Sequence, residues 1–166
     1  MQISEPNIDE ILTILVRDAR TPVEVIATMV GKTADEVRSA IAAYEKAGVI
    51  KRYKTVVDFE KIGSETVVAF IDVKVTPARD VGFDGIAARI AKFPEVQSVW
   101  LVSGSSDLRV MIESAHIREL GRFVAEKLST INGVTGTVTN FIMRRYKEDH
   151  VMFIETEEDQ RLVVSP

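Results

Sequence analysis

The sequence predicts an α+β fold of two domains, a small helical domain followed by a larger domain of mixed strands and helices. Three helical patterns occupy residues 8–48. Strand and helix patterns then follow in the order β-α-β-β-α-β from residue 65 to residue 146. The centre of the second pattern is a predicted hairpin over residues 96–113, in which two runs rich in β-branched residues flank four turn formers, Gly104, Ser105, Ser106 and Asp107. A length of 166 residues fits two small domains.

The composition narrows the classes of function. With 46% hydrophobic residues, the chain can bury a core, and no stretch approaches the roughly 18 apolar residues of a membrane span. The first ten residues lack the pattern of a signal peptide, which predicts a cytoplasmic protein. No cysteine and only two histidines make a disulfide, a thiolate site or a metal site unexpected, and no cofactor is predicted. A net charge of −4 requires any contact with nucleic acid to come from a local patch.

The first two helices are predicted from apolar spacing. Ile8, Ile11, Leu12 and Leu15 form one buried stripe of a helix that ends near residues 17–20. Pro22, with Thr21 before it as the predicted cap, begins a second helix that Gly31 ends. Its inward residues are Val23, Ile26 and Val30.

The third helix has the clearest start signal. Thr33 and Glu36 have the spacing of a capping box, and Gly48 is a suitable C-terminal stop. The buried stripe is expected to be Val37, Ala40, Ile41 and Tyr44. A helix, a second short helix, a turn containing glycine and a longer helix form the helix-turn-helix arrangement.

A basic segment follows the third helix. Residues 49–57 have a strand pattern that could start a β-wing, so residues 1–57 are predicted to be a winged helix-turn-helix domain. If the third helix enters a major groove, Arg38 is the best candidate to reach a base or a phosphate. Residues 1–61 carry nine Lys or Arg against ten Asp or Glu, so solvated surface charge remains an alternative. The DNA-binding candidates are Lys32, Thr33, Arg38, Ser39, Lys51, Arg52 and Lys54.

The second domain is predicted to be a ferredoxin-like βαββαβ sandwich over residues 65–150, after a polar linker at residues 58–64. Strands at 65–75 and 134–146 flank the hairpin on either side. A helix with Phe83, Ile86, Ala87 and Ile90 inward ends at Pro94, and a second has Ile117, Leu120, Val124, Leu128 and Ile131 inward before Asn132-Gly133. Right-handed crossovers place both helices on one side of the sheet.

The other face of this sheet is then uncovered. It is expected to carry Val68, Phe70, Met111, Phe141 and Met143 beside Arg109 and Glu113. Contiguous apolar surface of this kind predicts a homodimer formed through sheet faces. The alternative is that the C-terminal segment 151–166, with a strand at 151–154 and an acidic run at 155–159, covers the face.

The hairpin turn is a candidate ligand site. Gly104 can bring backbone close to a ligand, Ser105 and Ser106 can offer N–H groups to an anion, and Asp107 can bind an ammonium group. Together they could hold a free amino acid, although a turn stabilised only by local hydrogen bonds is the alternative. No arrangement of catalytic residues is apparent, so an enzyme is not predicted.

Short segments along both halves form one pattern: Tyr44-Glu45, Gly48-Val49-Ile50 with the basic segment, Val57-Asp58 with Ile62-Gly63, Leu101-Val102-Ser103-Gly104 with Asp107, and residues 128–134. Over residues 8–146 this pattern, with the two predicted domains, resembles the Lrp/AsnC family of transcriptional regulators. It implies a regulator that binds DNA as a dimer or a ring of dimers and binds a small effector, often an amino acid, near the hairpin turn. By position it implies Ser103, Gly104 and Asp107 for the effector, and Arg38 and Ser39 for DNA.

One departure from the family keeps two alternatives open. Ala40 stands where many members carry a basic residue, and Asp35 and Glu36 lie in the same helix. A helix of this composition leaves the strength of DNA binding open. The first alternative is an enzyme of tetrapyrrole metabolism, similar to sirohaem decarboxylases, on the same architecture. The second is a ligand-sensing oligomer that does not bind DNA by itself.

Overall fold

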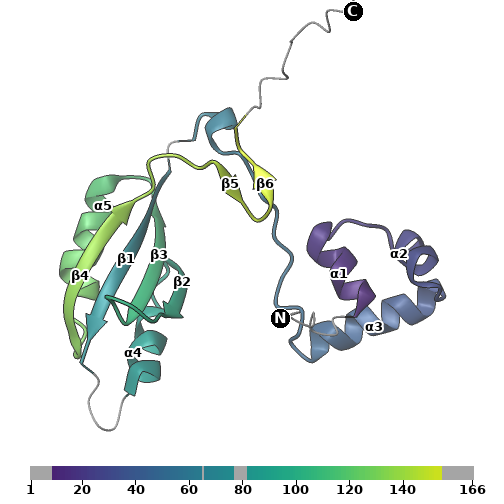
Figure 1. The fold of residues 1–166 in the computed structure, drawn as a ribbon, viewed down its shortest axis with the longest axis horizontal. Coiled ribbons are helices and arrows are strands. Elements are labelled where there is room, and N and C mark those ends of the chain that lie inside the picture. The colour runs from purple at the N-terminus through teal and green to yellow at the C-terminus, as the bar shows by residue number, and fades with distance from the viewer. Residues whose placement is uncertain (1–8, 65, 77–81, 155–166) are drawn as a thin grey trace, which may run out of the picture. The chain divides into compact units, whose positions relative to one another are not determined.

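The computed structural model describes residues 9–64, 66–76 and 82–154, and the chain divides into two compact units, Met1–Val56 and Val57–Pro166 (Figure 1). The first unit is helical and the second contains a sheet. Within the described residues, no helix is long and apolar enough to cross a membrane.

The helical unit consists of α1 (Glu10–Arg17), α2 (Val23–Val30) and α3 (Ala34–Lys46). Its core is made of Ile11, Ile26, Ala27 and Val37, so each helix contributes the apolar stripe that its spacing predicts. Gly31 ends α2 in the left-handed conformation, with φ of 68°, and lets the chain turn at once into α3. The predicted helix-turn-helix arrangement is confirmed.

Local hydrogen bonds fix the helix starts. The backbone N–H of Ile11 donates to Asp9 Oδ1 at 2.8 Å, and the hydroxyl of Tyr44 in α3 donates to Asp9 Oδ2 at 2.7 Å. These bonds, that of Tyr44 first, lower the pKa of Asp9. The capping box of Thr33 and Glu36 is present as predicted. Thr21 does not cap α2: Pro22 occupies the cap position without a side-chain bond, and the Thr21 hydroxyl donates to the carbonyl of Asp18.

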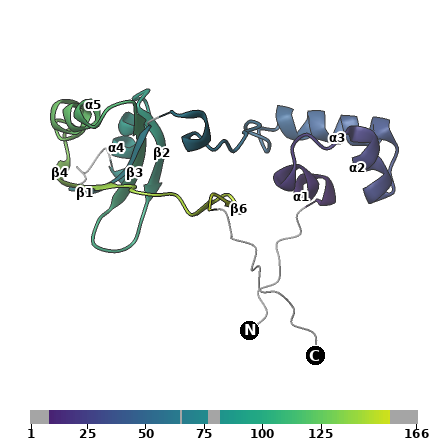
Figure 2. The same ribbon diagram turned by 90° about the horizontal axis from the view of Figure 1, so that it is seen from above.

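The sheet unit has the predicted ferredoxin-like order. Its elements are β1 (Val67–Val75), α4 (Gly82–Ile90), β2 (Val96–Leu101), β3 (Leu108–Ser114), α5 (Ile117–Arg122) with a π-helical continuation η2 (Phe123–Leu128), and β4 (Val134–Phe141). The strands are antiparallel in the order β2-β3-β1-β4. Figures 1 and 2 show α4 and α5 on one face of the sheet. The core lies between these two helices and the sheet and includes Ile71, Ile86, Val110, Leu120 and Leu128.

The second helix differs from the prediction. Ile117 is 56% exposed instead of inward, and Phe123, which the 3.6-residue spacing omits, is 3% exposed. Phe123 and Leu128 lie five residues apart and are both buried, because the π-helical turn places residues i and i+5 on one side. Gly133 follows with φ of 99°, which strains any other residue, and a Cβ there would lie 2.6 Å from Ile86 Cδ1, so the position favours glycine.

Four predicted strand or linker segments need correction. Residues 49–57 do not form a wing strand: residues 51–58 have no regular structure. The segment 58–64, predicted to be a polar linker, contains a short 3-10 helix, η1 (Glu60–Ile62), and groups with the sheet unit. The last strand ends at Phe141 instead of residue 146, and the strand predicted at 151–154 is β6 (Val151–Met152), paired with β5 (Lys147–Glu148). The acidic run 155–159 lies outside the described residues.

Candidate DNA-binding and effector-binding sites

The solvent-facing side of α3 carries the candidate DNA-reading residues. Asp35, Arg38, Ser39, Ala42 and Lys46 are all exposed, as their spacing predicts. Lys32 is exposed in the turn before α3. The structure therefore brings Lys32, Arg38 and Ser39 to one end of one helix, where a groove of DNA could receive them.

Thr33, another of the DNA-binding candidates, forms hydrogen bonds within the protein. The hydroxyl of Thr33 donates to Glu36 Oε2 at 2.8 Å, and the Thr33 backbone N–H donates to the same oxygen at 2.8 Å. These bonds, with that from the backbone first, lower the pKa of Glu36 and keep a negative charge in the first turn of α3. Thr33 thus acts first as a helix cap.

Arg38 is held by two acidic side chains. Its Nη2 lies 2.6 Å from Glu24 Oε1 in α2, and its Nη1 lies 2.7 Å from Asp35 Oδ1 one turn earlier in α3. All three side chains are more than half exposed. A phosphate or base that binds Arg38 must compete with these two carboxylates.

The basic segment after α3 is tied to that helix. The hydroxyl of Tyr53 donates to Glu45 Oε1 at 2.9 Å, and burial, followed by this bond, raises the pKa of Tyr53. Lys51 folds back so that its Nζ would be 3.2 Å from a Cβ at Gly48. Lys51, Arg52 and Lys54 are exposed. The three cations therefore stand on a coil next to the C-terminal end of α3, in the same unit as the reading helix.

The hairpin turn between β2 and β3 exposes backbone donors. Ser103, Gly104 and Ser105 are exposed, and Gly104 has φ of 150°, a conformation that favours glycine. Within the described part of the chain, nothing accepts a hydrogen bond from the backbone N–H groups of these three residues. An anion can therefore bind there without displacing an internal bond.

Asp107 joins this turn to β1. Its carboxylate Oδ2 accepts from the backbone N–H of Val75 at 2.9 Å, its N–H donates to the carbonyl of Val73 at 3.1 Å, and its carbonyl accepts from Val102 at 2.9 Å. The side chain extends the β1–β3 ladder where the register of β1 against β4 shifts at Lys74 and Val75. The other carboxylate oxygen, Oδ1, accepts no hydrogen bond from the residues that the structure describes.

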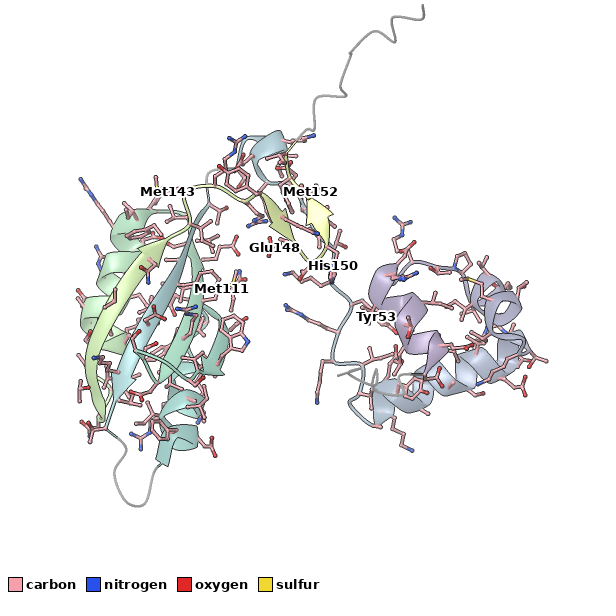
Figure 3. The ribbon with its side chains drawn as sticks, in the orientation of Figure 1. Tyr53, Met111, Met143, Glu148, His150 and Met152 are labelled. Carbon is pink, nitrogen blue, oxygen red and sulfur yellow. The ribbon has the colours of Figure 1, made fainter. Side chains whose placement is uncertain are left out.

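The sheet face opposite to α4 and α5 is covered by neither of these helices and is called the open face here (Figure 3). Cross-strand pairing assigns its side chains to two rows: Trp100, Arg109, Asp72 and Val138 in one, and Ser98, Met111, Phe70 and Asn140 in the other. Val68 is on this face but is only 6% exposed. Phe141 is not on it, because Phe141 pairs with Ala69, whose side chain lies in the core. The predicted uncovered face exists, with Asn140 and Val138 as its β4 side chains.

A polar cluster that sequence reasoning did not assemble lies on the open face. Asp72 accepts from Arg109 Nε at 2.7 Å and Nη2 at 3.1 Å, from Asn140 Nδ2 at 3.2 Å and from Ser106 Oγ at 3.4 Å. The Arg109 bonds are the main cause of the lowered pKa of Asp72. The sequence contains one signal for this cluster. Asp72 and Arg109 carry opposite charges, and each lies between apolar residues in its predicted strand, so both could face the same side of the sheet.

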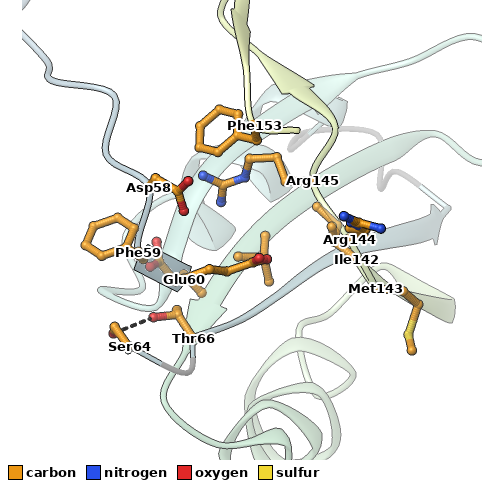
Figure 4. A pocket seen from close by; sticks show the side chains of 12 residues that line it. Asp58, Phe59, Glu60, Ser64, Thr66, Ile142, Met143, Arg144, Arg145 and Phe153 are labelled. Atoms are coloured by element: carbon orange, nitrogen blue, oxygen red, sulfur yellow. Dashed lines mark hydrogen bonds between the residues drawn. The ribbon is translucent and has the colours of Figure 1, made fainter. Parts of the chain in front are cut away.

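A cleft of about 120 Å³ lies at the other end of the sheet unit (Figure 4). Its charged lining is partly paired internally, because Arg145 Nη1 lies 2.8 Å from Glu148 Oε2 and its guanidinium stacks 5.0 Å from the ring of Phe153. The sequence did not indicate this cleft, because its lining comes from separate segments: Asp58, Phe59, Glu60, Ser64, Thr66, Val68, Glu113, Ile142–Arg145 and Phe153.

Comparisons with known proteins relate this chain to transcriptional regulators. Residues 68–152 match the family model described as the Lrp/AsnC ligand binding domain. A Bacillus subtilis HTH-type transcriptional regulator, YugG, is 47% identical over 167 residues, covering all of both chains. The regulator FL11 of Pyrococcus horikoshii is 30% identical over 149 residues, covering 89% of this chain and 95% of the relative. A solved transcriptional regulator from Neisseria meningitidis, in complex with L-Met, shares the fold with a TM-score of 0.67 at 23% identity, over 84% of this chain and 89% of the other.

Proposed function

This chain belongs to the Lrp/AsnC family of transcriptional regulators, and from that premise we propose that it binds specific sites on double-stranded DNA as a homodimer and responds to a small effector such as an amino acid. It acts in the cytoplasm, and it acts by binding rather than by catalysis. Higher assembly, as a ring of dimers, is part of the proposal.

The observation that carries this proposal is the exposed face of α3 beside the basic coil. Arg38 and Ser39 project from the helix that follows the tight Gly31 turn, which is the helix that enters the major groove in helix-turn-helix proteins. Lys51 and Arg52 follow the same helix and are exposed. We assign base reading to Arg38 with Ser39, and phosphate binding to Lys32, Lys51, Arg52 and Lys54.

The open face supports the homodimer. Trp100 is 44% exposed and Val138 62%, on a face where neither helix of the unit packs. Water contact with apolar side chains is unfavourable, so a second copy that covers them stabilises the assembly. Two copies bring two reading helices to one DNA site, which strengthens binding through effective concentration.

The hairpin turn supports the effector site. The N–H groups of Ser103, Gly104 and Ser105 are available to a carboxylate, and Asp107 Oδ1 is available to an ammonium group. These are the two charged ends of a free amino acid. The L-Met bound in the Neisseria relative agrees with a ligand of this class.

Fluorescence anisotropy with a duplex from the promoter of its own gene tests DNA binding. We expect log K to fall linearly with log salt, and Lys51→Ala or Arg52→Ala to reduce that slope by about one unit each, because each removes one phosphate contact. Arg118→Ala, an exposed cation on α5, is the matched control and should leave the slope unchanged. No binding at low salt would refute the DNA-binding role and favour an oligomer that only senses ligand.

Thermal unfolding in the presence of each common amino acid tests the effector site. A ligand that binds only the folded protein raises the midpoint by mass action, so at least one amino acid should stabilise the chain. Gly104→Val should abolish the shift, because its side chain strains a backbone with φ of 150° and blocks the exposed N–H groups. No shift with any amino acid would remove this ligand class from the proposal.

A further inference from the structure

Asp72 and Arg109 form an ion pair on the open face that other polar side chains also contact. The two residues face each other across β1 and β3, and both guanidinium-to-carboxylate bonds are made, at 2.7 Å and 3.1 Å. Asn140 from β4 and Ser106 from the hairpin also donate to Asp72, at 3.2 Å and 3.4 Å. Donors from three neighbouring segments therefore hold the Asp72 carboxylate in one orientation before any partner arrives.

Apolar side chains surround this pair. The guanidinium of Arg109 lies 5.9 Å from the centre of the Phe70 ring, and that ring lies 6.3 Å from Trp100. Val138 is the cross-strand neighbour of Asp72 on β4. The two charges thus lie next to apolar side chains, and a partner that covers these side chains would exclude water from the pair.

The pair remains partly open to a partner. The Arg109 side chain is 47% exposed, whereas that of Asp72 is 18% exposed. A surface that presents a positive and a negative charge side by side fits another surface with the same two charges in reversed order. A twofold axis that relates two copies of one face can supply that reversal, since each residue then meets the other's counterpart.

We propose that the Asp72–Arg109 pair selects the partner at the open face, so that the chain pairs with a second copy of itself and rejects a face with unbalanced charge. The inference rests on the proposed dimer through the open face. Bringing like charges together in an interface without water is unfavourable, so this selection acts mainly by excluding wrong partners. The apolar neighbours supply most of the association free energy.

Charge reversal in the full-length chain tests this selection. Asp72→Lys places two cations at the position of the pair, and Arg109→Glu places two anions there. We expect each variant alone to dimerise at least about tenfold more weakly than the wild type, because like charges meet across the interface. An equimolar mixture of the two should form heterodimers whose dissociation constant returns to within about threefold of the wild type. Sizing by light scattering and native mass spectrometry measure both.

Controls separate failure of selection from failure of the dimer or of folding. Arg89→Glu, an exposed reversal on α4, should dimerise as the wild type does. Far-UV circular dichroism establishes that each variant is folded. If charge reversal prevents folding, the neutral double variant Asp72→Asn with Arg109→Gln replaces it, and this variant should pair indiscriminately with itself and with the wild type.

Three outcomes overturn the inference. The first is that folded Asp72→Lys or Arg109→Glu dimerises as tightly as the wild type, which leaves the sheet-face dimer standing without charge selection. The second is that their mixture forms no heterodimer. The third is a neutral double variant that still discriminates between partners. A monomeric wild-type chain would instead refute the dimer itself, and the selection with it.

Discussion

At the scale of single residues, Asp107 has both a structural and a proposed ligand-binding role. Its Oδ2 satisfies the N–H of Val75 in a partly buried position, and Oδ1 is left for a ligand. Asp107→Ala should therefore abolish the effector response while dimerisation persists, and it should also destabilise the sheet unit by about 1–3 kcal/mol, because the Val75 N–H loses its partner. Urea unfolding with and without ligand measures both effects.

Asp107→Asn is the matched comparison for this prediction. Its side-chain oxygen can still accept from Val75, so stability should be near that of the wild type. The ammonium contact loses its charge, so the ligand response should weaken. An unchanged ligand response in Asp107→Ala would remove this residue from the effector site.

The second residue-scale prediction concerns Arg38. Glu24→Gln removes one of the two carboxylates that hold its guanidinium. Exposed ion pairs of this kind are worth about 0–1 kcal/mol, so freeing Arg38 should raise DNA affinity by up to about fivefold at low salt. Anisotropy titrations of both proteins measure the change. Glu10→Gln, which removes one negative charge from α1, controls for net charge, and an equal gain in both variants would contradict a specific effect on Arg38.

At the scale of elements, short-range signals were predictable. The capping box of Thr33 and Glu36 depends on two residues three apart, the end of α2 depends on Gly31 alone, and the hairpin turn depends on the four residues 104–107. Each is decided within a few residues of sequence, so the local pattern suffices to locate it. The placement of both helices on one side of the sheet was predictable because crossovers have one hand.

The prediction of a strand at residues 49–57 was wrong because residue preference does not show whether a partner strand is present. Residues 49–57 contain four valine or isoleucine residues and a tyrosine, a composition that favours strands, yet 51–58 is coil. A strand needs a neighbouring strand for its N–H and carbonyl groups, and residue preference carries no information about where such a neighbour lies. For the same reason, Phe141 was placed on the wrong face: its partner Ala69 decides its side, and that register is a long-range fact.

The π-helical turn gives a test at the element scale. The sequence period predicts Ile117 inward, whereas the structure buries Phe123, whose ring packs edge-on against Phe93 at 5.5 Å. Phe123→Ala should destabilise the unit by about 3–5 kcal/mol because it leaves a cavity in the core. Ile117→Ala, at an exposed position, should change stability by less than about 0.5 kcal/mol. Denaturant unfolding compares the two, and a larger loss for Ile117 would contradict the turn.

At the scale of the whole molecule, DNA affinity should depend on the proposed dimer, which forms through the sheet unit, although the helical unit contacts the DNA. Met111→Lys places a charge on the open face and should convert the chain to a monomer. Losing the second reading helix then should weaken DNA binding by about a hundredfold or more. Light scattering and anisotropy measure both, and Ile117→Lys, the same charge gain on the helix-covered side, should change neither. A monomeric Met111→Lys that binds DNA as tightly as the wild type would separate dimerisation from DNA recognition.

As with the fold, sites within one short segment could be predicted from the sequence, whereas sites assembled from distant segments could not. Candidates near one another in sequence, Ser103 to Asp107 or Lys51 to Lys54, were found because a short segment contains them. The Asp72 cluster was not assembled, since Asp72, Ser106, Arg109 and Asn140 meet only through strand pairing across three strands and a turn. The acidic partners of Arg38 were missed in part for the same reason: Glu24 comes from another helix.

The ion pair on the open face has a meaning for any genome that encodes several proteins of this architecture. If positions 72 and 109 select the dimer partner, then the amino acids at these positions form a code, readable from sequence, for which chains can pair. Chains that share the code would exchange subunits and pool their operators, whereas chains with a mismatched code would keep separate regulons despite an identical backbone.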